Sequence, residues 1–264
     1  MGNVNSNQEE NSKKSDKEKI DFGFKKVDAS SKAGMVFDVF ESVASKYDIM
    51  NDLMSGGLHR LWKDKMIYKM RPKEDSRLLD LAGGTGDIAF RFYKKAKQND
   101  LTVHITVTDI NEHMLEQGKA KGIDSNIIEN VDWNVVNAEE IPYDDNSFDY
   151  VSIAFGIRNV TDRNKALKEI LRVLKPSGKF VCMEFSHVDN PIMAKIYDGI
   201  SFGVIPNVGK IVTGDKESYQ YLVESIREFP SREEFRIMIE DAGFRNVSYE
   251  TLSQGVVAIH TGVK

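Results

Sequence analysis

The sequence predicts an α/β domain: a doubly wound, mostly parallel sheet of seven strands that ends in a C-terminal antiparallel hairpin. Short apolar runs alternate with amphipathic helical stretches from residue 77 onward, as in successive βαβ units. The composition, with 41% hydrophobic and 29% charged residues, is that of a folded domain. The last two apolar runs are separated only by the turn signal Ser253-Gln-Gly255, which predicts the hairpin.

The N-terminal elements precede this alternation. Residues 1–30 are polar and charge-rich, so we expect a largely disordered tail before a domain over residues 31–264. Apolar residues then recur at helical spacing over 36–44 and predict a helix that faces the core. With a second predicted helix over 58–70, this segment forms a helical cover that we assign to residues 31–72.

Strands and helices alternate after the cover. The predicted strands cover residues 77–82, 103–108, 131–136, 148–155, 179–185, 246–252 and 256–261. The predicted helices cover residues 87–97, 112–122, 161–174 and 231–242. Asn111 and Ser231 are suited to cap two of these helices, and Glu234 completes a capping box with Ser231. Residues 190–230 interrupt the alternation, and we expect them to form a substrate-binding insertion or lid.

Composition excludes several function classes. A net charge of −5 repels phosphate backbones and makes nucleic acid an unexpected partner. The single cysteine, Cys182, lies in an apolar run and predicts a buried strand thiol. Five scattered histidines and no paired cysteines predict no metal site. No charge-free apolar run is long enough to span a bilayer.

The strongest chemical motif is a glycine-rich loop between a predicted strand and a predicted helix, Leu79-Asp-Leu-Ala-Gly-Gly-Thr-Gly-Asp87. Gly84 and Gly86 let the backbone turn sharply and a ligand approach closely, and Thr85 offers a hydroxyl and an amide. The loop fits the dinucleotide pattern G-x-G-x-x-A as well as a methyltransferase loop. Asp80 favours the second, because a strand-end carboxylate suits a methionine amino group and is badly placed beside a pyrophosphate.

Two further strand ends add polar groups. Asp109 ends the second strand, where a carboxylate can accept both ribose hydroxyls of either cofactor. Asn137 and Ala138 follow the third strand, in the turn that holds the adenine ring in methyltransferases. The predicted S-adenosylmethionine site therefore comprises Asp80, Gly84, Thr85, Gly86, Asp109, Asn137 and Ala138. A loop without a ligand and an NAD-dependent dehydrogenase remain the alternatives.

Four longer motifs add a family resemblance. They run from Tyr47 to Trp62, from Phe155 to Thr161, from Arg172 to Ser186 and from Tyr219 to Pro230. With them, the sequence from about residue 22 to residue 264 resembles the ubiquinone/menaquinone biosynthesis C-methyltransferases. Ala154 stands where bacterial members tend to carry Ser, which favours the mitochondrial branch.

The resemblance implies a class I methyltransferase fold and methylation of a ring carbon of 2-methoxy-6-polyprenyl-1,4-benzoquinol in ubiquinone biosynthesis. It also implies a multi-enzyme complex and peripheral contact with the matrix side of the mitochondrial inner membrane, although the sequence shows no transit peptide. We further consider a homodimer. The alternatives are methylation of demethylmenaquinol, a small-molecule methyltransferase of another class and a scaffold subunit of the biosynthetic complex.

Three residues are candidates for the chemistry. Arg158 and Asn159 follow the fourth strand, at the ligand-binding edge of an open α/β sheet. Arg158 can stabilise a phenolate oxygen but needs a water for proton removal, because a guanidinium stays protonated. Asn159 can orient that water or hydrogen-bond the ring oxygen, and Tyr47 can close over the sulfonium. An ion pair with a carboxylate is the structural alternative for Arg158, and core packing is the alternative for Tyr47.

Overall fold

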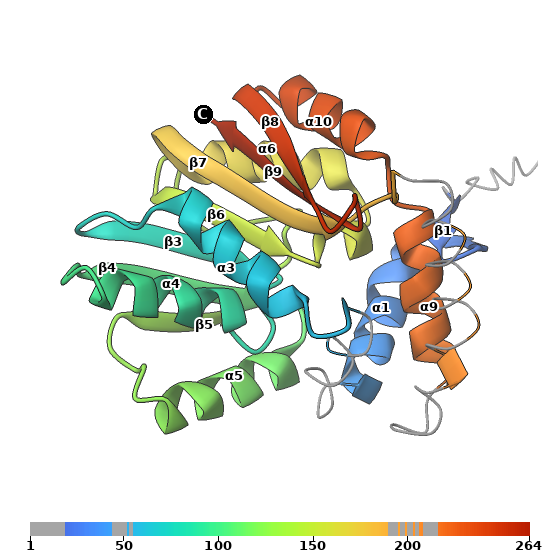
Figure 1. Cartoon of the computed structure of the whole chain (residues 1–264), viewed down its shortest axis with the longest axis horizontal. Coiled ribbons are helices and arrows are strands. Elements are labelled where there is room, and N and C mark those ends of the chain that lie inside the picture. The colour runs from blue at the N-terminus through green and yellow to red at the C-terminus, as the bar shows by residue number, and fades with distance from the viewer. Residues whose placement is uncertain are drawn as a thin grey trace, which may run out of the picture.

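A computed structural model describes residues 19–43, 52, 55–189 and 216–264, together with residues 195, 199, 203, 206 and 207. Seven strands form one sheet in the order β5-β4-β3-β6-β7-β9-β8 (Figure 1). Their bounds are β3 Ser76–Leu81, β4 Val103–Asp109, β5 Val131–Val135, β6 Phe148–Ala154, β7 Leu174–Phe185, β8 Arg245–Leu252 and β9 Val257–Val263. The first five strands in this order run parallel, and β9 pairs antiparallel with both β7 and β8. The predicted sheet and its C-terminal hairpin are confirmed.

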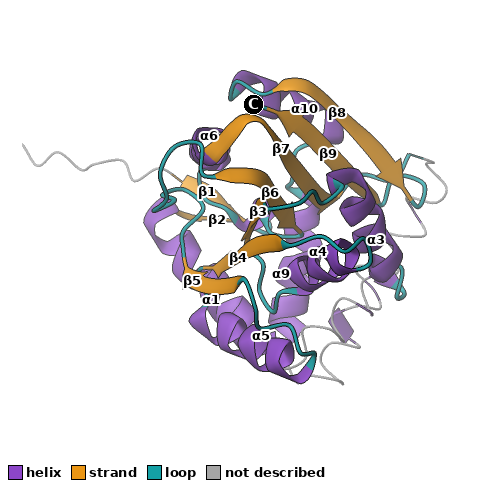
Figure 2. Cartoon of the chain, turned by 90° about the vertical axis from the view of Figure 1, so that its left-hand side faces the viewer, coloured by secondary structure: helices purple, strands orange, loops and turns teal. Residues whose placement is uncertain are grey.

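Helices cover both faces of this sheet (Figure 2). One face packs against α3 (His59–Met70), α4 (Asp87–Lys97) and α5 (Glu112–Asp124). The other packs against α6 (Arg163–Val173) and α10 (Arg232–Asp241). The central strand β3 accordingly buries side chains on both faces, with Leu78 on the first and Leu79 on the second. Because both faces are covered, the parallel strands have the continuous apolar runs that predicted them.

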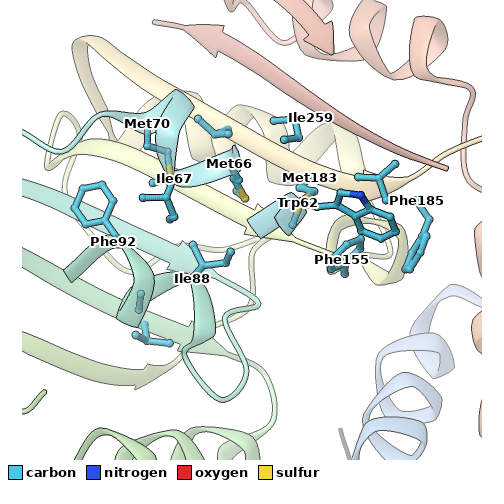
Figure 3. Close-up of a cluster of buried hydrophobic side chains, with 14 of the residues drawn as sticks. Trp62, Met66, Ile67, Met70, Ile88, Phe92, Phe155, Met183, Phe185 and Ile259 are labelled. Atoms are coloured by element: carbon cyan, nitrogen blue, oxygen red, sulfur yellow. The ribbon is translucent and has the colours of Figure 1, made fainter. Parts of the chain in front are cut away.

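Helix α3 shows how the apolar spacing produces the core. Trp62, Met66 and Met70 recur every four residues on one side of the helix and are at most 4% exposed. Figure 3 shows them facing the sheet together with Phe155 and Phe185. Burial of each such side chain contributes roughly 1.5–3 kcal/mol, so this face holds α3 on the sheet.

Two predicted helix starts are confirmed. The Asn111 side chain accepts the Met114 N–H, at 3.1 Å, and caps α5. The Ser231 hydroxyl accepts the Glu234 N–H, and the Glu234 carboxylate accepts the Ser231 N–H, so the capping box of α10 is complete. These caps satisfy N–H groups that the first helical turn leaves without a partner.

The structure differs from the sequence expectation at the N-terminal side. Within the segment we expected to be largely disordered, β1 (Lys19–Phe22) and β2 (Lys25–Asp28) form an antiparallel hairpin, followed directly by α1 (Ala29–Val43). The hairpin packs on α9 (Lys216–Arg227), with the Phe22 ring stacked on Tyr221 at 4.1 Å between centroids. This contact joins segments far apart in the sequence, and local composition does not reveal it.

Helices α1 and α9 lie side by side at one end of the sheet (Figure 1). Of the expected insertion at 190–230, α9 and the residues after it are described, while most of 190–215 lies outside the described residues. Residues 1–18 also lie outside them. Within the described part of the chain, no helix is both long and apolar enough to cross a membrane.

Candidate cofactor and substrate site

The candidate site lies where the sheet changes winding direction. Strand β3 sits between β4 and β6, so the connections after β3 and β6 leave the sheet in opposite directions. A cavity with an empty volume of about 850 Å³, part of it open to solvent, occupies this edge. Its walls come from the residues that follow β3, β4, β5 and β6, and α1 covers it.

The glycine-rich loop after β3 brings backbone to the cavity wall. Gly84 lines the cavity with a φ of +54°, a conformation that glycine adopts without strain. A Cβ atom at this position would lie 3.0 Å from Met114 Cε, so the loop leaves little room for a side chain. The loop therefore offers a ligand bare backbone, as the sequence predicted.

Asp109 provides the carboxylate of the cavity. Its Oδ2 accepts the Gly84 N–H and its Oδ1 accepts the Asn111 N–H, each at 3.0 Å. Burial raises the pKa of Asp109, and these backbone N–H groups oppose that rise. A carboxylate has about four acceptor positions, so each oxygen can still accept a hydroxyl. Asp109 therefore fits a ligand with two neighbouring hydroxyls, such as a ribose.

The turn after β5 forms the next part of the wall. Asn137 and Ala138 both line the cavity, beside the buried side chain of Val136. Asn137 Oδ1 accepts the Glu139 N–H at 3.0 Å, which fixes the turn. The turn thus brings an amide side chain and the apolar Val136 and Ala138 to the cavity wall, a combination that suits a purine ring.

Three predicted cofactor residues lie away from the cavity. Asp80 is 1% exposed and sits beneath the loop, where Ser152 Oγ donates to its Oδ1 at 2.6 Å. Burial raises the pKa of Asp80 to about 7. Thr85 points to the other side of the loop and accepts from Lys121 Nζ at 3.3 Å. Gly86 makes room for Trp133, whose ring would lie 2.6 Å from a Cβ there. In this structure all three support the loop.

The side chains of the two predicted residues after β6, Arg158 and Asn159, point in different directions. Asn159, in the short 3₁₀ turn Ile157–Asn159, lines the cavity. Arg158 is buried, and its Nη1 donates to Glu184 Oε1 at 2.7 Å and to the Phe155 carbonyl at 2.6 Å. The structure thus gives Arg158 the ion pair that was the alternative to a role at the ring. Tyr47 lies outside the described residues.

Several residues of the cavity wall were not predicted from the sequence as site residues. Helix α1 contributes Val36, Phe37 and Phe40, which the apolar spacing identified only as a core-facing set. Asn111, predicted as a helix cap, also lines the cavity. Tyr221, from the motif that runs from Tyr219 to Pro230, was not missed in this way: it stands behind the wall, and its hydroxyl donates to Asn159 Oδ1 at 3.0 Å. Spacing marks a face as apolar, but it does not tell a core from a ligand pocket.

The sequence profile of the ubiE/COQ5 methyltransferase family matches residues 26–264. The chain belongs to this family. Two proteins named ubiquinone/menaquinone biosynthesis C-methyltransferase UbiE are among its similar relatives. The one from Rickettsia akari is 57% identical and the alignment covers 93% of this chain and 98% of that protein. The one from Rickettsia bellii is 56% identical, with 92% and 98% covered.

Solved structures share the fold at low identity. A SAM-dependent methyltransferase from Aquifex aeolicus has a TM-score of 0.55 at 18% identity, covering 76% of this chain and 88% of that chain. A SAM-dependent methyltransferase from Thermotoga maritima has a TM-score of 0.57 at 19% identity, covering 86% and 99%. These likenesses establish the class I methyltransferase fold that the family resemblance implied.

Family and fold together establish the activity class. This ubiE/COQ5 protein is an S-adenosylmethionine-dependent C-methyltransferase of ubiquinone/menaquinone biosynthesis. The cavity fits the cofactor, because Gly84 leaves backbone bare and Asp109 keeps acceptor capacity for ribose hydroxyls. The NAD-dependent dehydrogenase alternative is thereby set aside.

The expected mitochondrial inner-membrane location is wrong. It followed from the family resemblance, with Ala154 favouring the mitochondrial branch, whereas relatives that are 56–57% identical over more than nine-tenths of the chain are bacterial proteins. One small residue at the end of a strand does not distinguish the two branches, because either Ala or Ser fits such a position.

Proposed function

We propose that this ubiE/COQ5 methyltransferase methylates a ring carbon of reduced 2-methoxy-6-polyprenyl-1,4-benzoquinol, the acceptor of the ubiquinone branch. The observation that carries the proposal is the placement of Asn159. Its side chain lines the same cavity as the aromatic side chains of Phe37, Phe40 and Phe155. An aromatic ring with one polar oxygen to anchor matches that combination.

The cavity residues divide into two groups in this proposal. Asp109 accepts the ribose hydroxyls of S-adenosylmethionine, Gly84 offers its backbone, and Asn137 and Ala138 border the adenine. The cofactor supplies an electrophilic methyl group on a sulfonium whose leaving group is neutral. General acid catalysis is therefore unnecessary, and the protein's task is to align the ring with the methyl group.

The acceptor must also become nucleophilic at carbon. A quinol does so when a ring hydroxyl gives its proton to water, and an amide N–H donor beside that oxygen stabilises the charge that remains. After the carbon takes the methyl group, it loses its own hydrogen to water as a proton, and the aromatic ring is restored. Asn159 is the cavity residue suited to this role. Arg158 acts at a distance: its ion pair with Glu184 holds the turn that carries Asn159. Tyr47 is proposed to close over the sulfonium.

The polyprenyl tail extends the proposal to the surroundings of the enzyme. A long isoprenoid partitions into lipid, so the ring reaches the cavity from a membrane surface. We accordingly propose peripheral membrane contact and association with other enzymes of the pathway. A homodimer would be compatible with both.

Methyl transfer to two acceptors tests the proposal. Labelled S-adenosylmethionine is incubated with a short-chain methoxy-benzoquinol or with a demethylmenaquinol analogue, each with and without reductant. Label on a benzoquinol ring carbon, dependent on reductant, is the expected result. Transfer to the naphthoquinol alone would reject the proposed acceptor and favour the menaquinone branch. The names of the Rickettsia relatives include both pathways. No transfer despite cofactor binding would favour a scaffold role.

A further inference from the structure

We propose that Tyr221 is a positioning residue for methyl transfer. By donating its hydroxyl to Asn159 Oδ1, it turns the NH₂ group of that amide toward the phenolate oxygen of the acceptor ring. The inference rests on the proposed function and adds a residue of α9 to a site otherwise built from α1 and strand-end loops. Tyr221 acts through Asn159, because Asn159 lines the cavity and Tyr221 does not.

The direction of the amide decides its chemistry. An asparagine side chain has one acceptor oxygen and one NH₂ group that points the other way. If the oxygen faced the cavity, it would repel a phenolate and disfavour ionisation of the quinol. With the oxygen held 3.0 Å from the Tyr221 hydroxyl, the NH₂ group is left for the ring. The same residue then favours the charged form of the acceptor.

The Tyr221 hydroxyl is suited to remain a donor. Its side chain is 5% exposed, and burial raises its pKa to about 12. Arg158 and Arg163 lower this pKa and Glu184 raises it, so the nearby charges partly offset one another. A phenol that stays protonated throughout the working pH range donates to the amide oxygen throughout that range.

The N-terminal hairpin fixes Tyr221 in turn. The Phe22 ring lies nearly parallel to the Tyr221 ring, at 21° and 4.1 Å between centroids. One turn further along α9, Glu224 Oε2 accepts the Phe24 N–H at 3.0 Å. Gly23 lies between Phe22 and Phe24 in the hairpin turn. It has a φ of +57°, and a Cβ atom at this position would overlap the Glu224 carboxylate. The hairpin thus supports the amide through the Tyr221 ring.

Tyr221→Phe tests this role by removing a single oxygen. We expect kcat to fall about tenfold, the effect of losing one hydrogen bond, with little change in the KM for S-adenosylmethionine. We also expect the acid limb of the pH–kcat profile to move up by about one pH unit, because the bound phenolate loses stabilisation. If the substitution only loosened the packing around the site, the plateau value of kcat would fall and the acid limb would stay in place.

Tyr150→Phe is the matched control. Tyr150 is similarly buried, at 4% exposed, but its hydroxyl donates to the Arg71 carbonyl at 2.9 Å and does not line the cavity. Its kcat and pH profile should match the wild type. Phe22→Leu keeps the Tyr221 hydroxyl and removes only the ring stack, so it should shift the acid limb in the same direction by less. Thermal unfolding of each variant verifies that it is folded.

A double-mutant cycle separates this inference from the proposed function. If Tyr221 acts through Asn159, Tyr221→Phe costs no further activity in an Asn159→Ala background. Equal losses in both backgrounds, or an unmoved acid limb in folded Tyr221→Phe, would overturn the inference. All variants are assayed with the acceptor that the wild type methylates. If that acceptor is a naphthoquinol, the proposed acceptor is rejected, but the cycle still measures the coupling between Tyr221 and Asn159. No turnover with either acceptor rejects both.

Discussion

Neighbouring side chains in this site serve different purposes, and Arg158 is the clearest case. Next to Asn159 in sequence, it points into the protein and pairs with Glu184 while Asn159 lines the cavity. Both members of the pair are at most 4% exposed. Removing one partner of such a pair leaves a buried charge without compensation, which is more costly than removing both.

Arg158→Ala should therefore reduce stability as well as turnover. We expect the free energy of unfolding in urea to fall by about 3–5 kcal/mol, because Glu184 is left buried and unpaired. Arg158→Met combined with Glu184→Leu should recover part of the loss. Arg236→Ala is the control: it breaks the exposed pair with Glu233 and should change stability little. Unchanged stability of Arg158→Ala would contradict the buried-pair account.

Asp80 predicts a pH dependence of stability. Its folded-state pKa of about 7 lies above its ordinary value of 3.8, so the folded protein holds a proton that the unfolded chain has lost. Stability from this group is full below about pH 4 and is lost as pH rises through 7. Asp80→Asn, which resembles the protonated form, should lose less stability between pH 4.5 and pH 7.5 than the wild type. Urea unfolding without cofactor measures the difference, and parallel curves would exclude it.

The sequence predicted the cavity at residue level only in part. It identified Gly84, Asp109, Asn137, Ala138 and Asn159, since strand ends in a parallel sheet converge at one edge. It also included Asp80, Thr85 and Gly86, which support the loop from other sides. A motif fixes where the backbone passes, but the direction of each side chain depends on the φ and ψ angles of a tight turn.

At the scale of elements, local signals predicted most boundaries. Helix α4 and the capped starts of α5 and α10 follow from spacing and capping residues, which act within a few positions. The hairpin β1–β2 was missed because Phe22 is held by Tyr221, almost the length of the domain away. Its composition is that of a tail, and only the tertiary contact stabilises it as a hairpin.

Helix α1 should respond to cofactor more than the helices packed on the sheet. It covers the cavity through Val36, Phe37 and Phe40, whereas α4 is held by the core independently of a ligand. We expect S-adenosylmethionine to slow amide hydrogen exchange over residues 29–43 while exchange in α4 changes little. Equal protection of both helices would argue that α1 is not a cover.

At the scale of the whole molecule, cofactor binding should raise the free energy of unfolding. A ligand that binds only the folded state adds about 2.7 kcal/mol at a concentration 100 times its Kd. We expect S-adenosylmethionine to raise the melting temperature of the wild type and NAD to leave it unchanged. Asp109→Ala should remain folded but lose most of the shift, because we propose its carboxylate as the acceptor for the ribose hydroxyls. An unchanged shift in that variant would remove Asp109 from the cofactor site.

The strand order has a consequence for how the protein is made. Strand β9 lies between β7 and β8 although it follows both in the chain. During synthesis on the ribosome, β8 has no neighbour to pair with until β9 has emerged and joined β7. The emerging chain therefore exposes the unpaired edge of β7 until Val263 is clear of the exit tunnel, and this edge is where a chaperone would protect the nascent protein.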